Sequence, residues 1–168
     1  MYIIMEDNRT ISKNTLSFTC SKTMKYLRTP ADIWKKLKKE FDFTLDACAS
    51  DDNHLVDKYY TIDNSALNHN WDGEVAYVHP LFDSKIGKFV EKASKSKGTF
   101  VFLLPASTHT RYFHQYFYKK DNVEIRFLEK PNRGFRFGKD DGTEETEEEL
   151  KKSIGYIKPL MICIMKNK

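Results

Sequence analysis

Apolar residues recur along this chain with the periods of two kinds of element, and the clearest helical pattern covers residues 31–41. In this segment, ADIWKKLKKEF, apolar side chains fall on one face and four lysines on the other. Thr29 and Pro30 precede it, and proline suits the first turn of a helix because its missing N–H has no partner there. A second amphipathic helix is predicted over residues 85–95, and a further helical segment over 110–118. The residues predicted to face the core from the first two helices are Ile33, Trp34, Leu37, Phe41, Ile86, Phe89, Val90 and Ala93.

Strand-like segments alternate with these helices, and one of them is apolar throughout. Residues 98–107 (GTFVFLLPAS) contain a continuous apolar run, the pattern of a strand buried on both faces. Residues 74–82 (EVAYVHPLF) predict another strand, which Pro80 stops. Strands alternating with helices predict an α/β fold built around a mostly parallel sheet. The remaining predicted strands cover residues 43–47, 123–129 and 158–166, with a weaker candidate at 54–61.

The length of 168 residues suits one domain, and we predict a polar N-terminal arm over 1–25 followed by a single domain over 26–168. With 12 Phe and 9 Tyr, the chain has the aromatic content of a folded protein. Its net charge of +4 is compatible with a nucleic-acid partner but does not require one. The acidic segment 139–152 (KDDGTEETEEELKK) is expected to be a solvated loop and the start of a helix.

Several classes of protein are disfavoured by composition. The three cysteines are scattered and the histidines dispersed, so we expect neither a disulfide framework nor a metal site. The N-terminal residues lack the pattern of a secretory signal, and no stretch approaches the ~20 apolar residues of a membrane span. We therefore expect a cytoplasmic protein without a membrane partner.

Candidate chemistry gathers at the ends of two predicted strands. Asp46 and His79 each follow an apolar strand, and ligands of open α/β sheets bind beyond the carboxyl ends of strands. Both side chains are therefore expected at one crevice, where a carboxylate suits an ammonium group or ribose hydroxyls. Small residues after Asp46 let a ligand approach the backbone. An aspartate at a strand end also often caps a helix, and the Asp63–Ser65 sequence is equally ordinary turn chemistry.

These segments follow one another in a distinctive order. TPADIW at 29–34 precedes LDACAS at 45–50, then come Asn53, YYTIDNSAL at 59–67, Trp71 and a strand that ends in a proline-containing tetrapeptide. In this order they resemble the phage and prophage type of DNA adenine-N6 methyltransferase. The later segments FLLPASTHTRYFH and RFLEKPNRGFRFG resemble that family as well, so the resemblance covers roughly residues 26–138.

The resemblance implies a Rossmann-like class I methyltransferase fold, a three-layer α/β/α sandwich. It implies S-adenosylmethionine as cofactor and DNA as substrate, in a bacterial cell and possibly as part of a phage or restriction-modification system. By position, Thr29 and Pro30 would line the methionine end of the cofactor, and Asp46 would hold its amino-acid part. Asp63 and Asn64 would lie near its ribose and adenine. The full set of cofactor-binding residues that the resemblance implies is Thr29, Pro30, Asp46, Ala47, Cys48, Asn53, Asp63 and Asn64.

The catalytic tetrapeptide departs from the family pattern, which is Asn or Asp, Pro, Pro, then Tyr or Phe. Here it is His79-Pro80-Leu81-Phe82. In the family, the first side chain and the next backbone carbonyl accept the two hydrogens of the adenine amine, and the aromatic residue stacks on the flipped base. His79 can accept a hydrogen only when its ring is neutral, which predicts an activity loss as pH falls through its pKa, about 6.5 for an unperturbed ring. Leu81 replaces a proline that stiffens the loop.

Three functions are therefore compatible with the sequence. The first is methyl transfer to adenine in DNA, and the second is a methyltransferase fold that binds cofactor or nucleic acid without conventional methylation. In the third, His79 serves as a base in another reaction. Basic residues are available for weak, salt-dependent phosphate contacts, although many of them also suit the solvated faces of helices. They are Lys35, Lys36, Lys38, Lys39, Lys85, Lys88, Lys92, Arg111 and Arg133.

Overall fold

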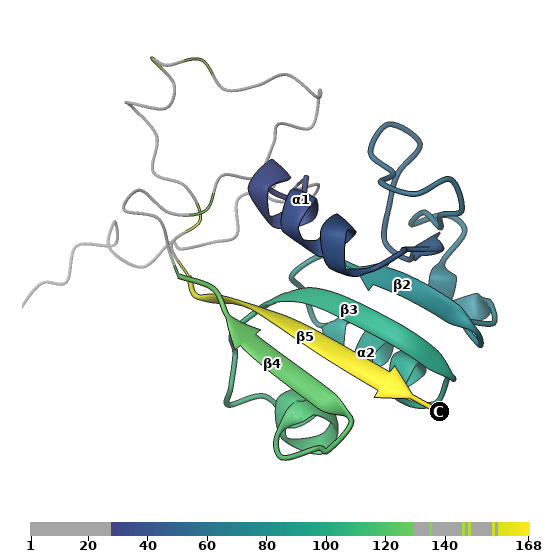
Figure 1. Cartoon of the computed structure of the whole chain (residues 1–168), viewed down its shortest axis with the longest axis vertical. Coiled ribbons are helices and arrows are strands. Elements are labelled where there is room, and N and C mark those ends of the chain that lie inside the picture. The colour runs from purple at the N-terminus through teal and green to yellow at the C-terminus, as the bar shows by residue number, and fades with distance from the viewer. Residues whose placement is uncertain (1–27, 130–134, 136–145, 147, 149–155, 157) are drawn as a thin grey trace, which may run out of the picture.

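A single five-stranded sheet organises the chain, with strand order β1-β2-β3-β5-β4 (Figure 1). The computed structural model describes residues 28–129, 135, 146, 148, 156 and 158–168. The predicted N-terminal arm lies outside these residues, as does the acidic segment 139–152 except for two positions. The strands are β1 (Leu45–Asp46), β2 (Glu74–Val78), β3 (Gly98–Pro105), β4 (Val123–Phe127) and β5 (Leu160–Asn167).

The strands of the described chain run mostly in one direction. β1, β2 and β3 are mutually parallel, whereas β5 is antiparallel to both of its neighbours, β3 and β4. β4 therefore points the same way as the first three strands, and β5 alone is reversed. The prediction of an α/β fold with a mostly parallel sheet is confirmed. The carboxyl ends of β1 and β2 consequently lie side by side at one edge of the sheet.

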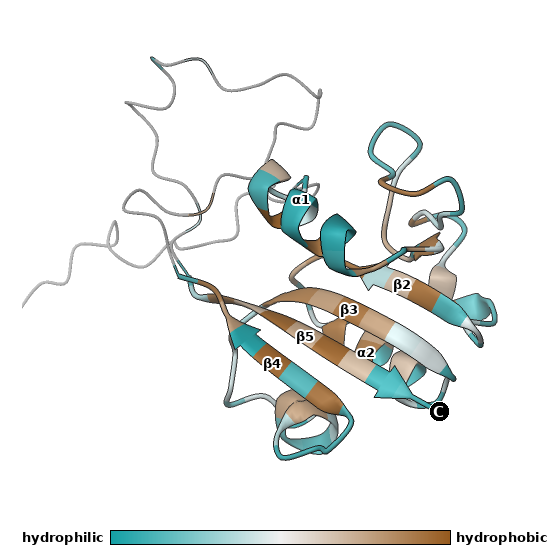
Figure 2. Ribbon diagram, viewed as in Figure 1, coloured by the Kyte–Doolittle hydropathy of each residue, from teal (hydrophilic) through white to brown (hydrophobic). Residues whose placement is uncertain are grey.

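The apolar strand β3 lies in the middle of the sheet and is buried on both faces, as predicted. Phe100, Phe102 and Leu104 pack into the same cluster as α2 (Ile86–Ser94). Val101 and Leu103 pack on the opposite side with α1 (Ala31–Glu40). Figure 1 shows the two helices on opposite faces, and Figure 2 shows the hydrophobic residues running along β3 and β5.

The two predicted helices have the predicted inward faces. In α1, Ile33 and Leu37 are buried and all four lysines are exposed. Trp34 is half-buried and stacks on Phe43, with ring centroids 5.1 Å apart. Pro30 is the N-cap of this helix, so its missing N–H falls where no helical partner is needed. The buried residues of α2 are Ile86, Val90 and Ala93, and Phe89 packs half-buried against the same cluster.

Three predicted elements differ from the structure. The strand expected over 43–47 is reduced to the two residues of β1. The prediction of a strand over 54–61 is wrong. This segment pairs with β1 through an isolated bridge between Asp46 and Tyr59, because β1 has two residues and cannot form a longer ladder. The helical segment expected over 110–118 is confirmed, but its main part, η3 (Phe113–Phe117), is a π-helix rather than an α-helix.

Gly98 begins β3 in a conformation that other residues rarely adopt, with φ of +140°. A Cβ there would lie 2.4 Å from the carbonyl oxygen of Glu74 on the neighbouring strand. We expect Gly98→Ala to lower the free energy of unfolding by about 1–3 kcal/mol, measured by urea denaturation. Gly87→Ala is the matched control, since its Cβ would find no atom closer than 3.8 Å. A Gly98→Ala protein as stable as wild type would contradict this reading of the β2–β3 junction.

Candidate functional site

A cavity of about 490 Å³ opens at the carboxyl ends of β1 and β2. This is where ligands bind in open α/β sheets, and the volume is within the range of small-molecule sites. The loop after β1, the loop that leads to β2, the tetrapeptide after β2 and the start of α2 all contribute to its lining. The lining residues are Arg28, Ala47–Ser50, Asp52, Asn53, Thr61, Ile62, Ser65–Leu67, His79–Asp83, Lys85, Lys88 and Phe89.

Seven of the predicted site residues come together in this lining, and five do not. Those in the lining are Ala47, Cys48, Asn53 and the whole tetrapeptide, His79, Pro80, Leu81 and Phe82. Those outside it are Thr29, Pro30, Asp46, Asp63 and Asn64. Asp63 and Asn64 are exposed, and Asn64 Oδ1 lies 2.7 Å from His69 Nε2. A direct cofactor contact by the five residues outside the lining stays a prediction.

Asp46 organises the loop that forms one wall of the cavity. The residue is 3% exposed, and its carboxylate accepts hydrogen bonds from the backbone N–H groups of Leu55, at 3.1 Å, and Cys48, at 3.3 Å. Burial raises the pKa of the carboxyl group to about 6, and the two N–H donors oppose that rise. Asp46 therefore fixes both ends of the loop that carries Ala49, Ser50 and Asn53.

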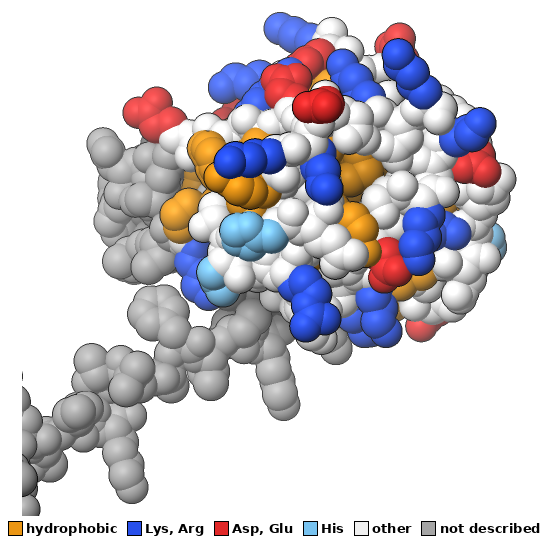
Figure 3. Space-filling view, turned by 90° about the horizontal axis from the view of Figure 1, so that it is seen from below, with side chains coloured by type: hydrophobic (Ala, Val, Ile, Leu, Met, Phe, Trp, Pro, Cys, Tyr) orange, Lys and Arg blue, Asp and Glu red, His pale blue; other side chains and the backbone are white. Residues whose placement is uncertain are grey.

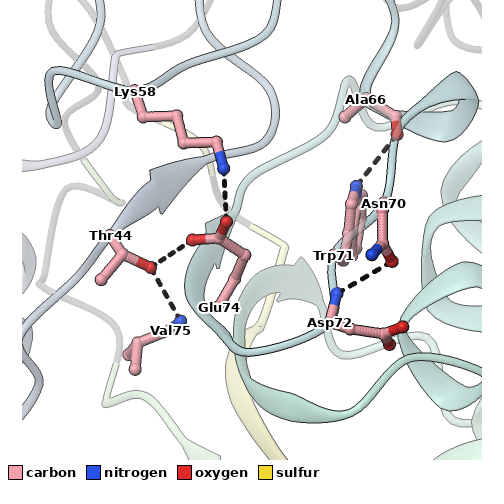
Figure 4. Close-up of polar contacts among 8 residues, drawn as sticks. All are labelled: Thr44, Lys58, Ala66, Asn70, Trp71, Asp72, Glu74 and Val75. Carbon is pink, nitrogen blue, oxygen red and sulfur yellow. Dashed lines mark hydrogen bonds and ion pairs between the residues drawn. The ribbon is translucent and has the colours of Figure 1, made fainter.

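The opposite wall is held by Trp71, one of the motif residues. Trp71 is fully buried, and its indole N–H donates to the carbonyl of Ala66 at 2.9 Å (Figure 4). This bond fixes the short helix η2 (Ala66–Asn68), whose first residues line the cavity. Near the start of β2, Glu74 contacts Lys58 and accepts a hydrogen bond from Thr44 at 2.5 Å, which ties the strand to both preceding loops (Figure 4).

The first residue of the tetrapeptide belongs to a chain of three hydrogen-bonding groups. Thr29 Oγ1 lies 2.8 Å from the hydroxyl of Tyr77 and 3.2 Å from Nδ1 of His79. Tyr77 is 1% exposed, and burial raises the pKa of its hydroxyl well above the usual value, so the phenol keeps its hydrogen. Thr29, predicted as a cofactor residue, is thus a partner of the catalytic segment.

This chain links the tautomer of His79 to Thr29 and Tyr77. Either hydroxyl can be the donor of the Thr29–Tyr77 bond, and Nδ1 of His79 either accepts a hydrogen from Thr29 or donates one to it. A neutral imidazole has one nitrogen that carries a hydrogen and one that accepts. Nε2 can therefore accept a hydrogen from an adenine amine only in the tautomer in which Nδ1 donates to Thr29.

Burial lowers the pKa of His79 to about 4. The unperturbed pKa of about 6.5 therefore does not apply in the folded protein, because the ring lies in a poorly solvated place that disfavours its charged form. At neutral pH the ring is therefore uncharged. It is also a weak base, which speaks against the third function considered above.

Phe82 places an aromatic ring at the cavity between the two core clusters. It is half-buried, and its ring centroid lies 5.4 Å from that of His79 and 5.6 Å from that of Tyr156. Pro80 is buried beside it, and the N–H of Asp83 donates to the carbonyl of Leu81 at 2.7 Å, so the tetrapeptide turns back immediately. The ring is held by its neighbours while one part of it remains at the cavity.

Sequence reasoning missed several lining residues. Ile62 is 55% exposed although it is apolar, and its position between motif residues was the available signal. Lys88 and Phe89 are on a helix that was predicted correctly, but only the packing of α2 shows that they face the cavity. Arg28 precedes the Thr29-Pro30 pair, where nothing in the local pattern distinguishes it from the other basic residues.

Basic side chains of the described residues are exposed on several elements. The lysines of α1 are exposed, as are Lys85, Lys88 and Arg111. On the face shown in Figure 3, Lys and Arg side chains are interleaved with Asp and Glu. Arg133 lies outside the described residues. In the described part of the chain no three His, Cys, Asp or Glu side chains gather as a metal site, and no helix there is long and apolar enough to cross a membrane.

The fold and the site define an α/β protein with a cavity of small-molecule size beyond the carboxyl ends of parallel strands. Residues 17–167 match a family described as DNA N-6-adenine-methyltransferase (Dam), and the chain belongs to this family. The resemblance noted from the motifs is thereby confirmed. The family is one of methyltransferases that modify adenine in DNA. No curated protein matches the chain.

Proposed function

We propose that this protein transfers a methyl group from S-adenosylmethionine to the N6 amine of adenine in DNA, using a Rossmann-like class I methyltransferase fold. The proposal depends on one observation: in this chain of the Dam family, the LDACAS loop and the tetrapeptide after β2 line the same cavity. Helices on both faces of the sheet agree with a three-layer arrangement. An enzyme acting on DNA in this way would work in the cytoplasm of a bacterial cell, whether encoded by the cell or by a phage.

The residues of the cavity fit this cofactor. Its lining combines apolar side chains such as Leu67 and Phe89 with polar ones such as Asn53 and Thr61, as sites for nucleoside-like ligands do. The small residues Ala47 and Ala49 leave room for a ligand against the backbone. When bound, S-adenosylmethionine supplies an electrophilic methyl group next to a sulfonium centre.

The residues of the tetrapeptide would receive the target adenine. The ring of Phe82 offers a stacking surface for a base turned out of the duplex, a step that costs a few kcal/mol. The carbonyl of Pro80 would accept one hydrogen of the adenine amine and His79 the other, which directs the nitrogen lone pair toward the methyl group. Exposed lysines, such as those of α1, would contact phosphates without reading the sequence.

A binding and transfer experiment tests the proposal. We expect calorimetry to show binding of S-adenosylmethionine and S-adenosylhomocysteine to the purified protein. We also expect N6-methyladenine in DNA that is incubated with the protein and S-adenosylmethionine, detected by mass spectrometry after digestion. No binding by the folded wild-type protein at millimolar cofactor would contradict the proposal at its first step.

A second candidate function is a protein that binds cofactor or nucleic acid without conventional methylation. The hydrogen-bond chain from Tyr77 through Thr29 to His79 favours it, because the imidazole Nε2 is an acceptor in only one of the two tautomers that this chain allows, whereas the family has an oxygen acceptor there. Cofactor binding without any N6-methyladenine in the product DNA would select this second function over the first.

A further inference from the structure

Arg28 is the cavity residue whose hydrogen-bonding capacity is least satisfied. Its Nε is buried and has no hydrogen-bond partner, while Nη2 donates to the backbone carbonyl of Asp52 at 2.9 Å. Within the described part of the chain no carboxylate forms an ion pair with this guanidinium. A buried N–H without an acceptor is costly, more so on a charged group. The arginine is therefore held beside the cavity with a donor that needs an acceptor.

The other cations of the cavity differ from Arg28 in exposure. Lys85 and Lys88 are exposed, and water can solvate their ammonium groups. Arg28 is half-buried, and its guanidinium is kept in place by the carbonyl of Asp52. That carbonyl belongs to the loop whose two ends are fixed by Asp46. The position of the Arg28 guanidinium thus depends on the same hydrogen bonds that hold the loop lining the cavity.

We infer that Arg28 binds the carboxylate of the amino-acid part of S-adenosylmethionine. The inference rests on the proposed function, since it assigns one end of the proposed cofactor to one end of the cavity. A guanidinium presents its donors in a planar fork that matches a carboxylate and is less suited to a neutral hydroxyl. A carboxylate in the cavity would pair with this guanidinium and neutralise its charge. A DNA phosphate has similar chemistry, so the experiment must separate the two.

The test uses calorimetry with S-adenosylmethionine and with its decarboxylated analogue, which differs only in lacking the carboxylate. We expect Arg28→Met to weaken binding of S-adenosylmethionine by about 30-fold or more, the effect of losing a charge-assisted contact. Binding of the decarboxylated analogue should change less than about threefold. Arg28→Lys, which keeps the charge but loses the fork, should fall between wild type and Arg28→Met.

Lys120→Met is the matched control, since it removes the same charge from an exposed residue outside the cavity and away from the proposed phosphate contacts. It should leave both affinities unchanged, and thermal unfolding should confirm that each variant is folded. If Arg28→Met weakened the binding of both ligands equally, the inference would be overturned and Arg28 would be a structural residue. Unchanged S-adenosylmethionine binding with weakened DNA binding would overturn it in favour of a phosphate contact. If wild type binds neither ligand, the proposed function itself fails. Binding that does not depend on Arg28 leaves that function standing.

Discussion

Replacing His79 with Asn and Leu81 with Pro should raise the rate of methyl transfer by about 10- to 100-fold. The amide oxygen of Asn always accepts a hydrogen, whereas Nε2 of His79 accepts one only in the tautomer in which Nδ1 donates to Thr29. Proline at position 81 restricts the loop, and small gains in the orientation of a reacting group change rates by orders of magnitude. The measurement is the initial rate of N6-methyladenine formation at saturating cofactor. Phe82→Ala in the same background should abolish activity, because the base loses its stacking partner.

The pH profile separates His79 from other groups. Because burial lowers the pKa of His79 to about 4, wild-type activity should not decrease through titration of this ring between about pH 8 and 5. The ring also affects the free energy of unfolding, because its pKa is lower in the folded protein than in the unfolded chain. Its stabilising contribution is present above the ordinary pKa of 6.5 and is lost as pH falls toward about 4. Unfolding must therefore be monitored beside the rate. An acid limb centred at about pH 6.5 in a protein that stays folded would show that the imidazole is solvated.

A double variant, with Asn at position 79 and Pro at position 81, that binds cofactor but stays inactive would place the defect outside the tetrapeptide.

Replacing Asp46 with Ala should weaken cofactor binding by about tenfold or more, although its side chain is not in the cavity lining. The substitution leaves the partly buried N–H groups of Cys48 and Leu55 without their acceptor, at a cost of up to about 1–3 kcal/mol for each. Relief from burying a carboxylate offsets part of that loss at neutral pH. The loop that carries Asn53 and the Asp52 carbonyl should then lose its fixed conformation. Calorimetry measures the affinity, and urea denaturation measures the stability.

The pH dependence has the opposite sign from that of His79. The pKa of Asp46 is raised to about 6, so its contribution to stability is fully present below the ordinary value of 3.8 and is lost as pH rises through about 6. The difference in stability between wild type and Asp46→Ala should therefore grow as pH falls from 7 to 4. Asp46→Asn, which keeps one oxygen acceptor, should show a smaller loss of stability with the same pH dependence, because neither variant has a titrating group at this position.

The same variants test whether Asp46 contacts the cofactor directly, as its place in the motif suggests. An ion pair with the ammonium group of the cofactor would make Asp46→Asn as damaging as Asp46→Ala. It would also make wild-type affinity decrease as pH falls through about 6. Lost binding without lost stability would identify a direct contact rather than an organiser of the loop.

The sequence by itself determined the elements whose pattern is strong and local. The apolar run of β3 and the two amphipathic helices were predicted because periodicity records which side of an element is buried. The order of the motifs was enough to indicate the family, and the strand ends before Ala47 and His79 located one cavity. These features depend on residues close together in the chain or on the general geometry of parallel strands.

Only the tertiary structure decided what each polar group of the site contacts. Asp46 has the position of a ligand-binding residue, but burial and two backbone donors engage its carboxylate. The ring of His79 is neutral at pH 7, with a pKa of about 4, because of its surroundings, and Thr29, 50 positions earlier in the chain, contacts its Nδ1. Arg28 became distinct among the basic residues only through its buried and unpaired Nε. Desolvation and long-range hydrogen bonds arise when distant segments meet, so the spacing of residues along the sequence does not record them.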